Sequence, residues 1–251
     1  MGENRFLLTF ITITLLLPFN SAKAENENSH KYVDLGLSVY WATTNIGAEK
    51  ETDYGDYFAW GETMANKEYY DRCTYKYCIN EGTVIGVPSF VYTKYIPECV
   101  PNPQNLNDNK FELDNEDDAA TMLWKGKWRM PTESEFLELQ DNKKCTWKWY
   151  TKGNSEFNGT AGFKVTSIVK GYEGTYIFLP AAGMKLHESS TDCFKDEYLF
   201  YWSKSLISFA CKYEDPYALC FNSELRAFDD DYSYSRYSGM SVRPVIPKET
   251  K

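Results

Sequence analysis

Histidine is scarce in this chain of 251 residues, which contains only His30 and His187. A serine or cysteine nucleophile needs a neighbouring base, and histidine is the usual one. The sequence also lacks a G-x-S-x-G motif, a phosphate-binding P-loop and a dinucleotide fingerprint. We therefore predict no catalytic residue and no cofactor. The hypothesis of a glycosidase with two catalytic carboxylates stays open, because aspartate and glutamate are plentiful.

Positive charge is also in short supply, with 27 Lys and Arg against 36 Asp and Glu and a net charge of −9. An acidic surface repels the phosphate backbone, so nucleic acid is not an expected partner. The acidic runs Glu112–Asp118 and Asp229–Asp231 are either calcium sites or solvated surface. Asp229–Asp231 lacks the spaced ligands of a known calcium loop, and no metal site is predicted.

Long apolar segments are absent beyond the N-terminus. Phe6–Phe19 is an apolar run of 14 residues, shorter than the roughly 20 that a membrane-spanning helix needs. Ala22 and Ala24 then form the small-x-small pattern of a cleavage site. These features predict a signal peptide over 1–24, cleaved after Ala24, and no transmembrane segment in the mature chain. We expect a secreted, periplasmic or cell-surface protein.

Seven cysteines follow the expected cleavage site: Cys73, Cys78, Cys99, Cys145, Cys193, Cys211 and Cys220. Export permits disulfides, and the odd count leaves at least one thiol free, buried or paired with another molecule. The C-x4-C spacing of Cys73 and Cys78 would suit zinc only with a second pair of ligands nearby. The sequence leaves the connectivity open.

Short aromatic and β-branched runs predict strands rather than long helices. They occur at Tyr32–Leu35, Val39–Ala42, Tyr176–Leu179, Tyr198–Lys204, Tyr217–Phe221 and Ser241–Ile246. Two helices are expected between them. One covers Asp117–Trp124, and the other begins at Thr132 with Glu135 in a capping box. Its buried face is predicted to consist of Phe136, Leu137 and Leu139. This order of elements favours an α+β fold over a repeated βαβ arrangement.

The predicted domain organisation is simple. A flexible segment over 25–31 precedes a single domain over 32–247, and a short tail covers 248–251. Within the domain, residues 64–110 lack a sustained hydrophobic period and contain three cysteines and four prolines. We interpret them as a long, irregular surface insertion, which a disulfide would hold in place.

Several sequence blocks resemble a known family, the Fibrobacter succinogenes major paralogous domain. The blocks occur in order over almost the whole mature chain, at 32–62, 74–78, 93–95, 112–120, 126–132, 145–147, 162–166, 178–183, 201–203 and 241–245. The strongest is Gly126–Thr132. The resemblance implies a C-type-lectin-like fold, with two helices packed on short, mostly antiparallel strands and long loops. It also implies a distant relationship to formylglycine-generating enzymes.

The shared blocks have a structural interpretation. Trp41, Trp60, Trp128 and Trp202 are expected in the core, because large aromatic rings dominate core energetics. Arg129 and Arg243 are expected to hold backbone carbonyls or a carboxylate through several donors.

Two functional alternatives stay open. One, a formylglycine-generating-type copper oxidase, comes with the resemblance. The related enzymes hold copper with two cysteines near the C-terminus, and Cys211 and Cys220 lie in that part of this chain. Thiolates select Cu(I), but the surrounding enzyme motif is absent. The other alternative is a structural component of a cell-envelope assembly, cross-linked through the unpaired cysteine. The tripeptides of calcium-dependent sugar-binding lectins are missing.

The preferred hypothesis is a binding module. Residues 228–237 are rich in Tyr, Ser, Asp and Arg, a composition that gives rigid contact area and adaptable hydrogen bonds. In related lectin-fold proteins this stretch lies on the exposed binding face. We therefore predict an unidentified protein or carbohydrate ligand, contacted by Asp229, Asp231, Tyr232, Tyr234, Arg236 and Tyr237.

Overall fold

The computed structural model describes residues 30–84, 87–186, 193–207, 216–224 and 235–249. The fold is α+β, as predicted, with short helices and mostly antiparallel strands. The helical elements are η1 (Asn115–Asp117), α1 (Ala119–Trp124) and α2 (Glu133–Gln140). The strands are β1 (Tyr32–Val33), β2 (Val39–Ala42), β3 (Cys78–Val84), β4 (Val87–Tyr92), β5 (Cys145–Tyr150), β6 (Gly162–Ser167), β7 (Tyr176–Pro180), β8 (Tyr198–Leu206), β9 (Pro216–Asn222) and β10 (Val245–Pro247).

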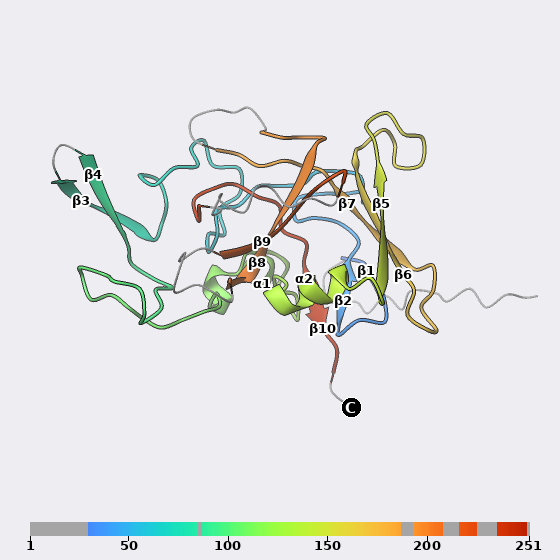
Figure 1. Cartoon of the computed structure of the whole chain (residues 1–251), viewed down its shortest axis with the longest axis horizontal. Coiled ribbons are helices and arrows are strands. Elements are labelled where there is room, and N and C mark those ends of the chain that lie inside the picture. Colours follow the sequence, from blue (N-terminus) through green and yellow to red (C-terminus); the bar gives the residue numbers. More distant parts are fainter. Residues whose placement is uncertain (1–29, 85–86, 187–192, 208–215, 225–234, 250–251) are drawn as a thin grey trace, which may run out of the picture.

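Within the described residues the strands form small sheets in the orders β1–β2–β10, β3–β4, β5–β6–β7 and β8–β9. The β3–β4 hairpin lies at one end of the long axis, and the β5–β6–β7 sheet lies towards the other (Figure 1). The first and last strands of the domain meet in one sheet, because β10 pairs with β2.

Strand β8 runs between the two halves of the core. Leu199 and Tyr201 pack in one cluster of buried residues, whereas Phe200 and Trp202 pack in the other. Successive side chains of a strand point to opposite faces, so one strand serves both clusters. All four side chains are fully buried.

The four tryptophans expected in the core are all buried. Two of them also bind backbone carbonyls through their indole N–H groups. Trp60 donates to the carbonyl of Ser203 at 2.8 Å, and Trp202 donates to that of Phe58 at 2.9 Å. Each ring therefore adds a directional contact to the apolar area that it buries.

The two arginines of the shared blocks act as predicted. The fully buried Arg243 donates to Asn45 Oδ1 at 2.8 Å and to the carbonyls of Ala42 and Phe178 at 3.0 and 2.9 Å. Arg129 binds the Glu135 carboxylate and the carbonyl of Met130. Arg243 thus joins the segment after β2 to strand β7.

Helix α2 begins with the predicted capping box, in which Thr132 accepts from the backbone N–H of Glu135 and the Glu135 carboxylate binds the N–H of Thr132. Phe136 and Leu139 are fully buried, as expected. The prediction for Leu137 is wrong, because its side chain is 51% exposed. It lies one residue from Phe136, about 100° around the helix axis, and so leaves the buried face.

The insertion over 64–110 is less irregular than predicted. It contains the β3–β4 hairpin, and it contributes buried side chains to the core: Tyr70, Tyr75, Tyr77, Tyr95, Ile96 and Val100. Cys99 of this segment is disulfide-bonded, in agreement with the expected covalent restraint. The segment is therefore part of the packed domain rather than a surface excursion.

Residues next to both predicted domain boundaries also make contacts with the domain. His30 stacks on Trp124 with ring centroids 3.7 Å apart, and the Lys248 ammonium lies 2.6 Å from Asp34 Oδ1. Strands β5 and β6 were not among the expected strands. Among the described residues, no helix is both long and apolar enough to cross a membrane.

Candidate functional site

Most of the predicted ligand-binding residues lie outside the described part of the chain, namely Asp229, Asp231, Tyr232 and Tyr234. Arg236 is described and is fully buried. Its guanidinium donates to the carbonyls of Lys94 and Tyr95 at 3.0 and 2.9 Å and lies 4.3 Å from the ring centroid of Tyr92. These contacts assign Arg236 to the internal structure and correct its prediction as a ligand-contacting residue.

Tyr237 keeps part of its side chain at the surface. It is half-buried, and the guanidinium of the exposed Arg72 lies 5.8 Å from its ring centroid. Two residues later, Gly239 pairs with Lys185. A Cβ atom on Gly239 would lie 2.6 Å from the Tyr70 ring, so a glycine is required for this close packing. The chain that follows Tyr237 is therefore closely packed against the core.

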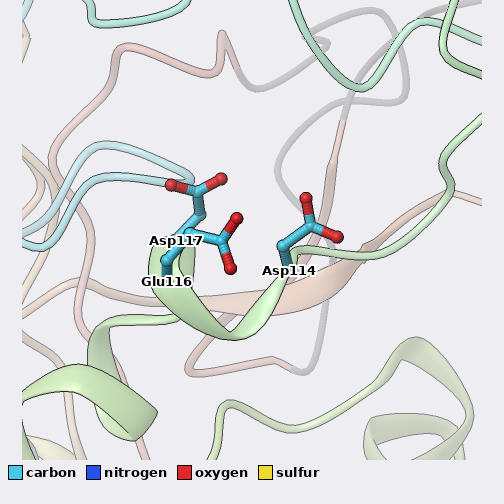
Figure 2. Close-up of side chains that lie close together, drawn as sticks. All are labelled: Asp114, Glu116 and Asp117. Atoms are coloured by element: carbon cyan, nitrogen blue, oxygen red, sulfur yellow. The ribbon is translucent and has the colours of Figure 1, made fainter.

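The acidic run Glu112–Asp118 forms the one group of possible metal ligands found among the described residues. The carboxylates of Asp114, Glu116 and Asp117 lie within 4.8 Å of one another, on η1 and the residue before it (Figure 2). However, the Lys94 ammonium lies 2.7, 3.7 and 2.6 Å from these three carboxylates. It occupies the position that a cation would take, so the cluster is an ion-pair network.

Asp117 is the centre of this network and is only 1% exposed. Lys76 binds Oδ1 of Asp117 at 2.8 Å, whereas Lys94 and the Tyr95 hydroxyl both donate to Oδ2. Burial alone would raise the pKa of Asp117, but the hydrogen bonds from Lys76, Lys94 and two tyrosines outweigh burial and hold the pKa well below its usual value. Within the acidic run Glu112–Asp118, Asp117 is therefore buried and ion-paired, not solvated.

Asp118 is buried as well, and it serves the fold. Its carboxylate accepts from the N–H of Thr121, which caps α1, and from the N–H of Met130. The hydrogen bonds join the start of α1 to the strongest sequence block. Burial raises the pKa of Asp118 in spite of these donors.

A shallow groove of about 260 Å³ lies at the start of α2. Phe111, Leu206 and Ile207 line its apolar part, and Thr132, Ser134 and Ser205 provide hydroxyls. The nearby N–H of Glu133 already donates to Ser205 Oγ at 3.3 Å. The groove is smaller than the roughly 300 Å³ at which small-molecule sites begin, and we assign it no ligand.

The cysteines show no zinc geometry in the described residues. Cys73 is an exposed free thiol and Cys78 a half-buried one, and no histidine or acidic side chain joins them in a metal-binding group there. Burial raises the pKa of the Cys145 thiol to about 11, which suppresses its reactivity. Of the pair considered for copper, Cys220 is buried on β9 and Cys211 lies outside the described residues.

A second surface, which the sequence did not predict, is formed by Glu51, Tyr54, Tyr150, Lys164, Tyr176 and Asp196; we call it the tyrosine surface. All six side chains are half-buried. The register of β5–β6–β7 places Tyr150, Lys164 and Tyr176 on the same face of that sheet. The Lys164 ammonium lies 4.4 Å from the ring centroid of Tyr176.

Glu51 and Asp196 complete the tyrosine surface from two loops. The Tyr54 hydroxyl donates to Asp196, and the Glu51 carboxyl lies near enough to the Tyr176 hydroxyl to contribute to the raised pKa of Tyr176. Lys152, on the β5–β6 loop, binds the other oxygen of Asp196 at 2.7 Å. For Asp196, burial favours a higher pKa, but the Lys152 and Tyr54 hydrogen bonds lower it overall. Glu51 differs, since burial raises its pKa despite the charges of Arg243 and Lys164.

The raised pKa of Glu51 gives a test of this arrangement. A carboxyl whose pKa is higher in the folded state destabilises that state once the pH exceeds its unfolded value. We expect Glu51→Gln to raise the Tm by about 1–2 °C at pH 7, with little change near about pH 4. Thermal unfolding at the two pH values measures this difference. Glu49→Gln, exposed on the same loop, is the control. A lower Tm of Glu51→Gln at pH 7 would contradict the account.

Comparisons with protein-family models, with curated proteins and with solved structures find no match to this chain. The family resemblance and the C-type-lectin-like topology therefore stay predictions.

Sequence reasoning missed Arg72, Glu51 and Tyr176 as surface residues of interest. No sequence pattern singled them out, because each gains its neighbours only when distant segments meet. The alternation of β5 (buried Cys145, exposed Thr146, half-buried Trp147, exposed Lys148) was the available signal for the tyrosine surface, because it marks a sheet with one face towards solvent.

Proposed function

We propose that the mature protein is an exported binding module that recognises a protein or carbohydrate ligand with the surface around residues 228–237. The observation that carries the proposal is the anchoring of the C-terminal end of this segment. Arg236 is fixed to the carbonyls of Lys94 and Tyr95, and Gly239 is packed against Tyr70. Binding surfaces are commonly loops positioned by a rigid scaffold.

The anchoring separates two roles within the segment. Arg236 positions the chain from inside the fold, whereas Tyr237 and Arg72 lie at the surface next to it. The remaining proposed contact residues are Asp229, Asp231, Tyr232 and Tyr234. Tyrosine supplies a large contact area with little loss of side-chain entropy, which suits a recognition surface.

The test is a triple variant in which Tyr232, Tyr234 and Tyr237 become alanine and Arg236 is kept. We expect an unchanged Tm within about 2 °C and at least a tenfold loss of affinity for the ligand found by screening glycans and bacterial or host cell surfaces. The matched control is Tyr40→Ala, which removes a half-buried tyrosine on β2. If every interaction of the wild-type protein survives in the triple variant, this surface is not the binding site.

A further inference from the structure

We propose that the free edge of β5 is a docking site for an extended peptide of another protein, in which acidic and apolar residues alternate. The peptide would add a strand beside Trp147 and Trp149 and so extend the β5–β6–β7 sheet. This site is separate from residues 228–237 and does not rest on the function proposed for them. Three properties of the described residues support it: free backbone groups, half-buried aromatic rings and positive charge.

The register of the β5–β6 pair decides which backbone groups of β5 point outwards. The N–H of Ile168 donates to the carbonyl of Lys144 at 2.8 Å, which makes these two residues a hydrogen-bonded pair. Hydrogen-bonded and non-hydrogen-bonded pairs alternate along an antiparallel ladder. Trp147 and Trp149 lie an odd number of positions further along and therefore belong to non-hydrogen-bonded pairs. Their N–H and C=O groups point away from β6.

These outward backbone groups of both tryptophans have no hydrogen-bond partner among the described residues, and β5 is the end strand of its sheet. The edge is closed on either side of them. The N–H of Cys145 donates to the carbonyl of Asp141 at 2.9 Å, and the carbonyl of Thr151 accepts from Asn154. The open part of the edge is therefore short and centred on the two tryptophans.

The opposite edge of the same sheet is covered. Arg243 donates to the carbonyl of Phe178 at 2.9 Å, and the Tyr201 hydroxyl donates to that of Pro180 at 3.1 Å, both on β7. Within the described chain, β5 is thus the edge of this sheet that is left open. An unpaired edge of this kind is a template for strand addition by another chain, and the backbone hydrogen bonds supply the affinity.

Aromatic area accompanies the free backbone groups on one face of β5. Trp147 and Trp149 are half-buried, and both pack edge-to-face on the buried Phe163 of β6, with centroid distances of 5.4 and 5.0 Å. Apolar side chains of a strand added next to β5 would lie on this same face and would cover more of the two indole rings. This face therefore favours apolar residues in the partner.

Positive charge lies on the other face of the same edge. Lys148 alternates with the two tryptophans, is exposed, and has no ion pair among the described residues. Its ammonium lies 4.7 Å from the ring centroid of Tyr150, and its cross-strand neighbour on β6 is a second lysine, Lys164. In a chain with a net charge of −9, this edge favours a carboxylate at the adjacent position of an added strand.

The same charge disfavours a second copy of this chain as the occupant. If two β5 strands paired antiparallel through both tryptophans, with Trp147 opposite Trp149, the two copies of Lys148 would lie directly opposite each other. Like charges in that position destabilise strand pairing, and a lysine on an edge strand protects against self-association. The edge therefore favours a different chain, with acidic residues on the lysine face and apolar residues on the tryptophan face.

Titration of a peptide into the full mature protein tests the proposal. The probe is acetyl-Thr-Val-Glu-Val-Glu-Val-Thr-amide, and the comparison peptide has lysine in place of both glutamates. We expect the acidic peptide to bind with a Kd below about 1 mM and at least about fivefold more tightly than the basic one. Amide hydrogen exchange measured by NMR locates the site. The N–H groups of Trp147 and Trp149 should be protected at least about tenfold by saturating peptide.

Four variants separate the contributions to peptide binding. Trp149→Pro removes the outward N–H at a position where an edge strand tolerates proline, and is expected to weaken binding at least about tenfold. Trp149→Val retains this N–H and should cost no more than about threefold. Lys148→Glu keeps both tryptophans and should weaken binding at least about fivefold, so it reports on the site even if Trp149→Pro does not fold. Lys170→Glu, exposed between β6 and β7, is the charge control and should change nothing.

Three titration results would overturn the proposal: no binding of the acidic peptide at about 1 mM, binding of the basic peptide at least as tight, or equal affinities in wild type, Lys148→Glu and Trp149→Pro. Sedimentation of the wild type tests the other occupant. A dimer at about 100 µM that Trp149→Pro abolishes would assign the edge to a second copy and would also overturn it. A loss with Tyr237→Ala but not with Lys148→Glu would place the peptide at the C-terminal surface instead.

Discussion

Arg243→Met is expected to destabilise the fold by about 4 kcal/mol, the largest effect of any single substitution considered for this protein. Methionine retains most of the side-chain volume but none of the donors. The change leaves three buried acceptors, Asn45 Oδ1 and the carbonyls of Ala42 and Phe178, without the guanidinium that now binds them. Each unsatisfied buried acceptor costs about 1–3 kcal/mol.

Thermal unfolding followed by circular dichroism measures the effect of Arg243→Met. The expected loss corresponds to a decrease in Tm of roughly 8–16 °C for a domain of this size. Arg72→Met is the matched control, because Arg72 is exposed and its loss is expected to change stability by less than about 0.5 kcal/mol. A decrease of less than about 3 °C for Arg243→Met would show that the guanidinium does not join β7 to the segment after β2.

Asp117→Asn has the second largest expected effect, about 2–3 kcal/mol of lost stability at neutral pH. The substitution leaves Lys76 and Lys94 without the carboxylate that both bind. Removing one partner of a buried ion pair costs about 3–5 kcal/mol, and the figure here is lower because these lysines are 52% and 23% exposed and regain hydration. The Tm is expected to fall by roughly 4–12 °C.

The pH dependence identifies the cause of the Asp117 effect. The pKa of this carboxyl is held well below its usual value, so its stabilisation is complete above the unfolded pKa and is lost as the pH falls through the folded one. The difference in Tm between wild type and Asp117→Asn should therefore be full at pH 6 and shrink steadily at acidic pH. Glu116→Gln, at a residue 69% exposed, is the control. A difference that is independent of pH would point to packing instead of charge.

The two substitutions affect different sets of polar contacts. Arg243 holds the β2 segment to β7, whereas Asp117 holds the side chains of Lys94 and Tyr95 in the segment over 64–110. Arg236 binds the backbone carbonyls of the same two residues. Lys94 and Tyr95 are thus held through their side chains by Asp117 and through their backbone by Arg236. These contacts explain how a segment with little hydrophobic periodicity is part of the core.

Local patterns in the sequence predicted the parts of the fold that local physics determines. The capping box of Thr132 and Glu135 and the aromatic strand starting at Tyr198 were both confirmed. Residues 64–110 were predicted less well, because Tyr95 is held by Asp117 and Arg236, which lie 22 and 141 residues further along the chain. No local pattern in that segment reveals such partners.

The same reasoning explains the errors at the candidate site. Arg236 follows several Tyr, Ser and Asp residues, and this polar context favoured an exposed position. Its acceptors, the carbonyls of Lys94 and Tyr95, are 142 and 141 residues away. The tyrosine surface escaped prediction for the same reason, since Glu51 and Tyr176 meet only in the folded chain.

The most direct test of the proposed binding function is one array measurement with the full mature protein. Wild type, the triple tyrosine variant at positions 232, 234 and 237, and the control Tyr40→Ala are applied to the same immobilised glycans and cell-surface extracts. The account predicts at least one ligand that wild type and Tyr40→Ala retain and that the triple variant fails to retain. Identical retention of every ligand by all three proteins would contradict it.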